Sequence, residues 1–157
     1  MIRTKRRLRL CVTLLCLNLI FIWGNSLLPG EISGALSNWL KNVLSALLGS
    51  TPGGAGGGGL LRKLAHFTEF TCLGMCLCWL FGMVRSKKTE QLLLPLACGF
   101  TAACIDETIQ LFIPLRGPSV KDVGIDTAGV ILGIVLITLF SCIKKNKINQ
   151  HLEENKR

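Results

Sequence analysis

The chain has 157 residues and a mass of 17.1 kDa, which is one domain's worth of polypeptide. Half of its residues are hydrophobic and its mean hydropathy is +0.50, so a soluble core of this size cannot hide them and a membrane protein is predicted. The formal net charge is +9, but the basic residues flank apolar runs, which argues against a nucleic-acid-binding stripe on a soluble fold.

The N-terminal part of the chain combines a basic start with an apolar run. Residues 1–9 are basic and residues 10–28 are uncharged. A signal peptide begins in the same way, but this run is long for one and no A-x-A cleavage site follows it. We therefore predict a retained first transmembrane helix. Residues 31–49 place apolar side chains at three- and four-residue steps, which predicts an amphipathic helix at the membrane interface or packed across the end of the bundle.

Three further apolar runs, at 64–84, 92–113 and 123–143, are long enough to cross a bilayer. The Gly-rich stretch 51–59 is typical of a flexible linker, and the polar tail 144–157 is predicted to be loose. The fold class is therefore an all-α integral membrane bundle with four transmembrane helices in a membrane domain at 10–143. The amphipathic helix is expected on its outer side.

The distribution of Lys and Arg predicts the orientation of the bundle. Five basic residues precede the first span, three follow the second span and five lie in the tail, which leaves five of the 18 for the other side. Because cytoplasmic loops carry the excess of Lys and Arg, both termini are predicted to be cytoplasmic.

Two sets of small residues have structural interpretations. All eight cysteines lie within or at the end of apolar runs, and none forms a CxxC pair. We interpret them as small apolar fillers of membrane helices rather than disulfides or zinc ligands. Gly129 and Gly133 have the GxxxG spacing that lets membrane helices approach closely.

Polar residues gather at the start of the second span and around the turn between the third and fourth. Ionisable side chains inside a membrane are costly unless paired, and they mark functional sites. In the predicted topology both groups reach the outer side. The candidate catalytic residues are His66, Glu69, Asp106, Glu107 and Asp126. The candidate ligand-binding residues are Arg62, Lys63, Gln110, Arg116 and Asp122.

These residues leave functions of different classes open. The basic side chains could hold a phosphate and the acids could bind polar groups, giving a binding site for an amphiphile of the outer leaflet without catalysis. Alternatively, His66 could act as a general base in a membrane-embedded enzyme. A divalent metal held by His66, Glu69, Asp106 and Asp126 is a variant of this hypothesis, although no established metal motif has this spacing. A structural ion network and a proton-coupled transporter are the remaining alternatives, and an oligomer would be compatible with each.

Three motifs identify a resemblance. They are RKLAHFTEFTCLG at 62–74, DETIQLFIPLRG at 106–117 and KDVGIDTAG at 121–129, with a weaker match in WGNSLLPGEIS at 23–33. In this order they resemble the VanZ-like family of small bacterial membrane proteins. The family commonly has glycine where Leu115 stands and often has tyrosine where Phe70 stands.

The resemblance implies a role in the cell envelope. The family takes its name from an accessory protein of glycopeptide-resistance clusters that is linked to lowered teicoplanin susceptibility. The expected location is the cell membrane of a Gram-positive bacterium. A lipid-linked cell-wall precursor or a lipoglycopeptide fits the amphiphile-binding hypothesis above and is the expected partner, whereas the resemblance carries over no biochemical mechanism. By position, the motif residues of the family coincide with the candidate site residues named above.

Overall fold

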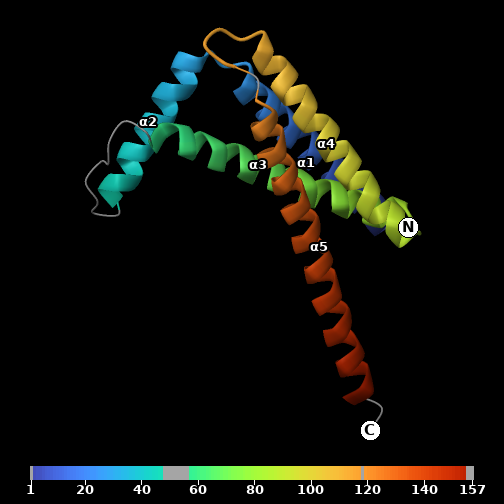
Figure 1. Ribbon diagram of the computed structural model, residues 1–157. Helices are drawn as coiled ribbons and strands as arrows, with labels where there is room; N and C mark the ends of the chain where they lie inside the picture. The colour runs from blue at the N-terminus through green and yellow to red at the C-terminus, as the bar shows by residue number, and fades with distance from the viewer. Residues whose placement is uncertain (1, 48–56, 118, 155–157) are drawn as a thin grey trace.

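The structure is a computed structural model, and it describes residues 2–47, 57–117 and 119–154. These residues form five helices and no strand (Figure 1). The helices are α1 (Ile2–Ser26), α2 (Gly30–Leu47), α3 (Gly57–Val84), α4 (Lys88–Leu111) and α5 (Val120–Glu154). The prediction of an all-α fold is confirmed.

Every helix except α2 contains a segment long and apolar enough to cross a membrane. These segments are Lys5–Ser26, Gly59–Val84, Lys88–Leu111 and Val120–Lys147. Large hydrophobic side chains such as Ile20, Phe100 and Phe140 are at least half exposed, as expected for helices whose outer faces contact lipid. The prediction of four membrane-spanning helices is confirmed by length and composition.

Two helices extend beyond the predicted apolar runs. α3 begins at Gly57, inside the stretch 51–59 that was predicted as a linker, and residues 51–56 lie outside the described residues. α5 continues to Glu154 through the tail that was predicted to be loose. The tail up to that point contains no glycine or proline and several good helix formers, so nothing in it ends the helix. At 35 residues α5 is about 50 Å long, and its C-terminal part projects away from the other helices (Figure 1).

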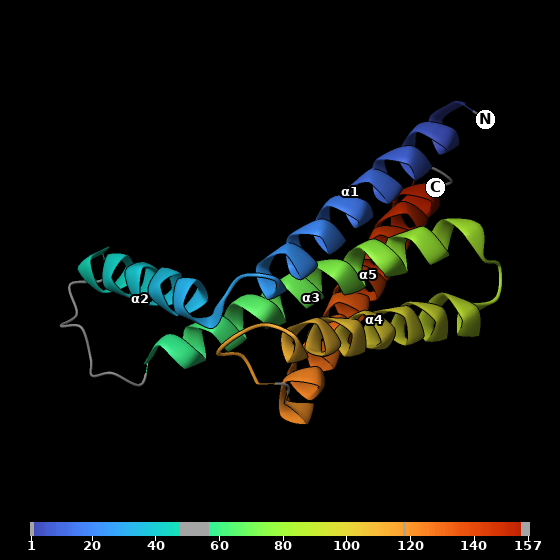
Figure 2. The ribbon, with the colours of Figure 1, turned by 90° about the horizontal axis from the view of Figure 1, so that it is seen from above.

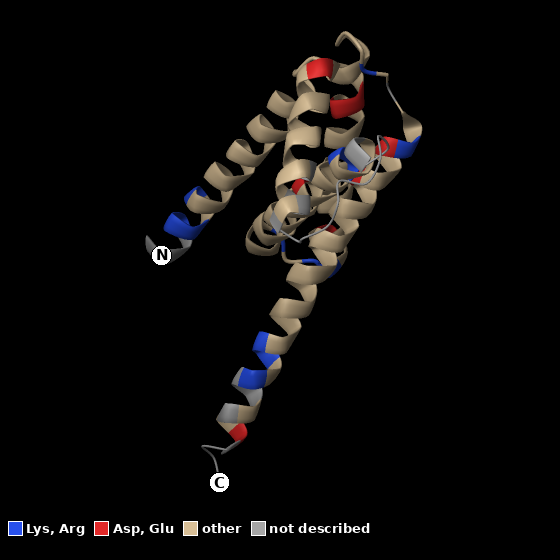
Figure 3. Ribbon diagram, turned by 90° about the vertical axis from the view of Figure 1, so that its left-hand side faces the viewer, with Lys and Arg blue, Asp and Glu red and all other residues tan. Residues whose placement is uncertain are grey.

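Successive spans run in alternating directions. One end of the bundle carries the α1–α2 connection and the α4–α5 turn, and the other carries the N-terminus and the α3–α4 turn (Figure 2). We call the first of these the polar end, because it holds the buried polar side chains described below. At the opposite end, Lys and Arg colour the beginning of α1 and the last part of α5 (Figure 3).

The most extensive helix contact joins α3 and α5, and glycine makes it possible. A Cβ atom added to Gly129 would lie 2.5 Å from the carbonyl oxygen of Phe67, and one added to Gly133 would overlap the carbonyl oxygen of Thr71. The predicted GxxxG spacing therefore brings α5 directly onto the backbone of α3. The surrounding core combines residues from α1, α3, α4 and α5, namely Ile22, Phe70, Leu73, Leu77, Cys78, Ala102, Ala103, Val130 and Ile134.

α2 is attached to the polar end and turns its apolar face away from the bundle. The Gly30 amide donates a hydrogen bond to the Pro114 carbonyl oxygen at 3.2 Å, and α2 also contacts α3. Ser33 is buried, whereas Leu36 and Trp39 are 53% and 61% exposed. The amphipathic helix predicted at 31–49 is thus present over Gly30–Leu47, with Ile32, Leu36, Trp39 and Leu40 exposed.

The cysteines take no part in covalent cross-links. All eight lie in described helices and all are free thiols. Cys11 and Cys78 are buried, while Cys16, Cys72, Cys98 and Cys142 are exposed on the helix surfaces. The surroundings of the two buried thiols agree with the interpretation as small apolar fillers.

Candidate functional site

The polar end gathers every buried polar or charged side chain found among the described residues. These are Ser26, Ser33, Asp106, Glu107, Gln110, Arg116 and Asp126. They come from α1, α2, α4, the α4–α5 turn and α5, and α3 adds His66 and Glu69, which are almost as well shielded. Burying so many polar groups in one place is unfavourable unless they satisfy one another or a ligand.

The centre of the cluster is His66 on α3, which faces two carboxylates. Its Nδ1 atom lies 3.8 Å from Asp106 Oδ2 and 4.0 Å from Glu69 Oε2. Both distances are longer than a hydrogen bond, and this nitrogen has no hydrogen-bond partner. Glu69 is three residues after His66, so the helix itself places the two side chains on one face.

A second layer of hydrogen bonds connects α4 and α3 to the end of α1. Gln110 Nε2 donates to Asp106 Oδ2 at 2.8 Å and to Ser26 Oγ at 3.3 Å. Asn25 Nδ2 donates to Glu69 Oε1 at 2.8 Å. These bonds fix one oxygen of each acid, whereas Asp106 Oδ1 and Glu69 Oε2 are buried without a hydrogen-bond partner.

The α4–α5 turn brings Arg116 into the cluster. Leu115 before it has φ = 59°, a left-handed conformation that glycine adopts at little cost and leucine rarely does. Arg116 Nη2 donates to the Asn25 carbonyl oxygen at 3.0 Å, while Nε and Nη1 are buried without a hydrogen-bond partner. Burial, and then the charge of Arg62, lower the pKa of the Arg116 guanidinium, although arginine remains protonated in proteins.

The first turn of α5 and the side chains that face it from α3 and α4 supply the remaining charges. Lys63 Nζ forms an ion pair with Asp122 Oδ1 at 3.0 Å. The Ser119 amide donates to Glu107 Oε2 at 2.8 Å, so the acid on α4 accepts a hydrogen bond from the chain that leads into α5. Asp122 also lies in the first turn of α5, where the helix dipole favours a negative charge.

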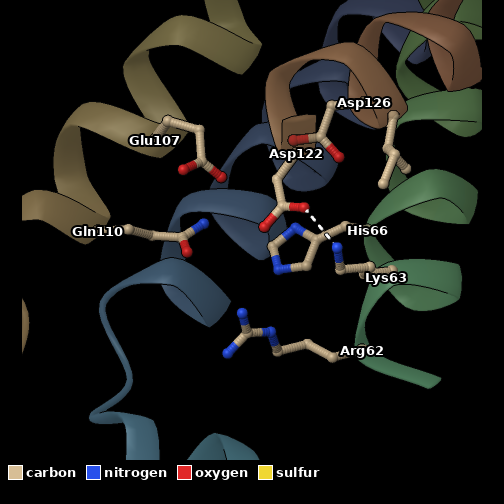
Figure 4. A pocket seen from close by; sticks show the side chains of 8 residues that line it. Arg62, Lys63, His66, Glu107, Gln110, Asp122 and Asp126 are labelled. Carbon is tan, nitrogen blue, oxygen red and sulfur yellow. Dashed lines mark ion pairs between the residues drawn. The ribbon is translucent and has the colours of Figure 1, made fainter. Parts of the chain in front are cut away.

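These side chains surround a small pocket that Figure 4 shows from close by. α3 contributes its basic residues and His66 on one side, α4 contributes Glu107 and Gln110 opposite, and α5 contributes Asp122 and Asp126. The lining residues are Arg62, Lys63, His66, Glu107, Gln110, Asp122, Ile125 and Asp126. Its cavity volume of about 10 Å³ is about the space of one water molecule or one ion.

The structure thus brings together residues that are distant in the sequence. Of the ten candidates, Glu69, Asp106 and Arg116 do not line the pocket itself, but contact the others or the end of α1. Among the residues proposed as metal ligands, donor atoms of His66, Asp106 and Asp126 lie within 4.8 Å of one another, and Glu69 adjoins His66.

Sequence reasoning missed three contributors, namely Asn25, Ser26 and Ser119. Asn25 and Ser26 end the first span with polar side chains, and this was the signal that could have revealed them. The role of Ser119 is carried by its backbone amide, which no side-chain pattern indicates.

Comparison with family models gives one family, VanZ/LLP1, whose model matches residues 7–141 and so covers most of the chain. The match includes all candidate site residues. It covers the second and third membrane-spanning segments completely, and the first and fourth except for their outermost residues. Comparison with curated proteins and with solved structures gave no significant match.

Proposed function

The chain belongs to the VanZ/LLP1 family, and from this premise we propose that its polar end binds the phosphate-bearing headgroup of an envelope lipid or lipid-linked wall precursor. The observation that carries the proposal is the Arg116 guanidinium, which is buried with two nitrogen atoms lacking hydrogen-bond partners. Guanidinium groups bind phosphate strongly, and leaving one unsatisfied in the folded protein is unfavourable unless an acceptor arrives. Arg62 and Lys63 provide further positive charge at the pocket.

The size of the pocket limits how such a ligand binds. A volume of about 10 Å³ does not admit a sugar ring or a whole phosphate group. We therefore place the phosphate outside the pocket, where Arg62 and Lys63 form its rim and Arg116 lies near Arg62, with one oxygen pointing inward toward His66. The polar part of the ligand beyond the phosphate would remain at the membrane surface.

An apolar groove on the same helices supports a ligand with a hydrocarbon tail. The groove has a cavity volume of about 330 Å³ and lies between α1, α3 and α4. Leu73 follows Glu69 by one helical turn on α3, and Ala102 precedes Asp106 by one turn on α4, so the groove continues from the polar cluster into the bundle. A headgroup at the polar end could extend an acyl chain along it.

We further propose that the polar end faces the outer side of the membrane, with both termini in the cytoplasm. The excess of Lys and Arg at the opposite end supports this orientation. The exposed apolar face of α2, with Trp39 on it, supports a position at the membrane interface. A C-terminal fusion to green fluorescent protein is expected to fluoresce and one to alkaline phosphatase to be inactive; the reverse pattern would refute the orientation.

The binding proposal is tested by comparing two lipids that differ only in the phosphate. Purified full-length protein in detergent is titrated with phosphatidic acid and with diacylglycerol of the same chains, and bound lipid is measured by native mass spectrometry. We expect selective binding of phosphatidic acid, weakened at least tenfold by Arg116→Lys but not by Arg85→Lys at the opposite end. Equal binding of both lipids would refute the proposal.

A role in resistance follows as a proposal from the family and needs a cellular test. Matched expression of wild type and Asp106→Asn in a Gram-positive host, with teicoplanin and vancomycin side by side, measures it. We expect protection against the lipid-tailed drug that Asp106→Asn abolishes. Absence of protection by the wild type would exclude resistance for this protein and leave lipid binding to the assay above.

Hydrolysis of a phosphate ester is the second candidate function. It is favoured by His66, which stands between the carboxylates of Glu69 and Asp106 and could be oriented by them as a general base. Release of inorganic phosphate from phosphatidic acid would support it, provided that His66→Gln abolishes the release and leaves the protein folded. If the wild type releases no phosphate, hydrolysis is refuted and only the binding function remains.

A further inference from the structure

The polar end contains more negative than positive charge. Five carboxylates, those of Glu69, Asp106, Glu107, Asp122 and Asp126, meet only three cationic side chains, those of Arg62, Lys63 and Arg116. With all five carboxylates ionised and His66 neutral, the formal excess is two negative charges. Such an excess is unfavourable at the end of a membrane bundle, and it would also repel the phosphate of the proposed ligand.

Two of the five acids are more deeply buried than the others. Glu69 accepts a hydrogen bond from Asn25, Glu107 accepts one from the Ser119 amide, and Asp122 pairs with Lys63. Asp106 and Asp126 are 0% and 1% exposed, and among the described residues neither has a Lys or Arg bound to it, although Asp106 accepts a hydrogen bond from Gln110. Their Oδ1 and Oδ2 atoms, respectively, are buried with no hydrogen-bond partner among the described residues.

His66 Nδ1 has no hydrogen-bond partner, and Asp106 Oδ2, which accepts from Gln110, lies 3.8 Å from it. One donor atom from each of His66, Asp106 and Asp126 lies within 4.8 Å of the others. Donors that share one ion at bonds of about 2.1 Å are roughly 3–3.5 Å apart, so side-chain rotations that close up to about 1.5–2 Å complete the geometry. The adjoining pocket has the volume of one further small ligand.

From this convergence of a shielded imidazole with two buried carboxylates we infer that His66, Asp106 and Asp126 bind one divalent metal ion. One imidazole nitrogen with two carboxylates suits Mn²⁺ or Zn²⁺ better than Ca²⁺ or Mg²⁺, which prefer oxygen ligands throughout. The ion cancels the two excess charges. Its open coordination position faces the pocket, where water or an oxygen of the ligand's phosphate completes the shell, and in this respect the inference rests on the proposed function.

Side chains around the three proposed ligands can orient them through hydrogen bonds, as the outer partners of metal ligands do. Gln110 orients Asp106 through its Nε2 atom and is itself held by Ser26 at the end of α1. Glu69 Oε2, 4.0 Å from His66 Nδ1 and unpartnered, is close enough to become a fourth ligand or to accept a hydrogen bond from bound water. Such outer partners set ligand orientation and tune metal affinity.

Metal binding is measured directly on the full-length protein in detergent. The protein is stripped with EDTA, exchanged into buffer and titrated with Mn²⁺, and free Mn²⁺ is followed by electron paramagnetic resonance. We expect saturation at about one ion per chain, competition by Zn²⁺, and affinity lowered at least tenfold by Asp126→Asn and by His66→Gln. Glu90→Gln, which removes one carboxylate at the opposite end, is the matched control and is expected to bind like the wild type.

The outcomes separate this inference from the lipid proposal. The absence of saturable Mn²⁺ or Zn²⁺ binding by folded wild type, or equal affinity for wild type and folded Asp126→Asn, would overturn the metal site. Phosphatidic acid binding is then measured in EDTA and with Mn²⁺. Lipid binding without any metal binding refutes the metal site and leaves the headgroup site standing. Metal binding without lipid binding refutes the headgroup site and leaves the metal site standing.

Discussion

The two ends of the bundle use the same charged residue types in opposite ways. At the polar end, Arg116 is only 9% exposed and its guanidinium is enclosed by the protein. At the other end, Arg85 is about half exposed and lies 3.9 Å from Glu90, whose side chain is also well exposed. Exposed charges at a membrane surface direct topology and contribute little to stability. Buried charges must be compensated by partners, so the residue types at the polar end are more restricted than those at the opposite end.

The largest expected effect contrasts these two arginines. Arg116→Met removes a buried cation and its hydrogen bond to the Asn25 carbonyl oxygen, and it is expected to lower the free energy of unfolding by about 1.5–3 kcal/mol. Arg85→Met removes an exposed charge, and its cost is expected to stay below about 1 kcal/mol. Thermal unfolding of both variants in the same detergent measures the difference.

Two outcomes bear on this contrast. Similar unfolding temperatures for Arg116→Met and Arg85→Met would show that the polar end does not depend on its buried cation. Conversely, recovery of much of the lost stability by Arg116→Lys would show that positive charge matters there more than the hydrogen bond to the Asn25 carbonyl.

The second prediction concerns the helix contact that holds the polar end together. Gly133→Ala would push a methyl group into the Thr71 carbonyl oxygen, and separating α5 from α3 is expected to cost about 1–3 kcal/mol. Gly124→Ala on the same helix meets no atom within 4 Å and should stabilise the helix by about 0.5–1 kcal/mol. Opposite shifts of the unfolding temperature are therefore expected, and a stabilising Gly133→Ala would contradict the close contact.

The smallest effect is expected at the turn that carries Arg116. Leu115 adopts φ = 59°, where a leucine costs about 1–2 kcal/mol that glycine does not incur. Because glycine also gains freedom in the unfolded chain, Leu115→Gly should stabilise the protein by no more than about 1 kcal/mol. Leu115→Ala keeps the strained backbone and is the control that should show no gain. An unfolding temperature lowered by Leu115→Gly would show that the exposed leucine side chain contributes to stability.

Much of this architecture is encoded locally and was accessible from the sequence. Hydrophobic runs determine the four spans, and the cost of ionisable groups in lipid pointed to His66, Asp106 and Asp126. The Gly129–Gly133 spacing indicated a close helix approach, although the sequence did not name α3 as the partner.

What escaped prediction depends on tertiary contacts. The direction of α2 follows from the close contact of Gly30 with the α4–α5 turn. The spacing of apolar residues in the sequence does not indicate this contact. α5 extends to Glu154 because the polar residues of this stretch have ordinary helix propensity. The prediction of a loose tail rested on their polarity alone. The hydrogen bonds from Asn25 and the Ser119 amide became visible only once the helix ends were brought together.

The pairing of α3 with α5 has a consequence for how the protein is made. The start of α5 lies 63 residues after that of α3, from Gly57 to Val120, so at roughly 5–20 residues per second the ribosome delivers it about 3–12 s later. By the end of that interval His66 and Asp106 are synthesised, but Asp126 and the glycine face of α5 are not. A nascent chain therefore carries His66 and Asp106 without Asp126 and without the helix contact of α5 until its last span inserts. Termination before α5 leaves a fragment that the membrane's quality-control proteases should recognise.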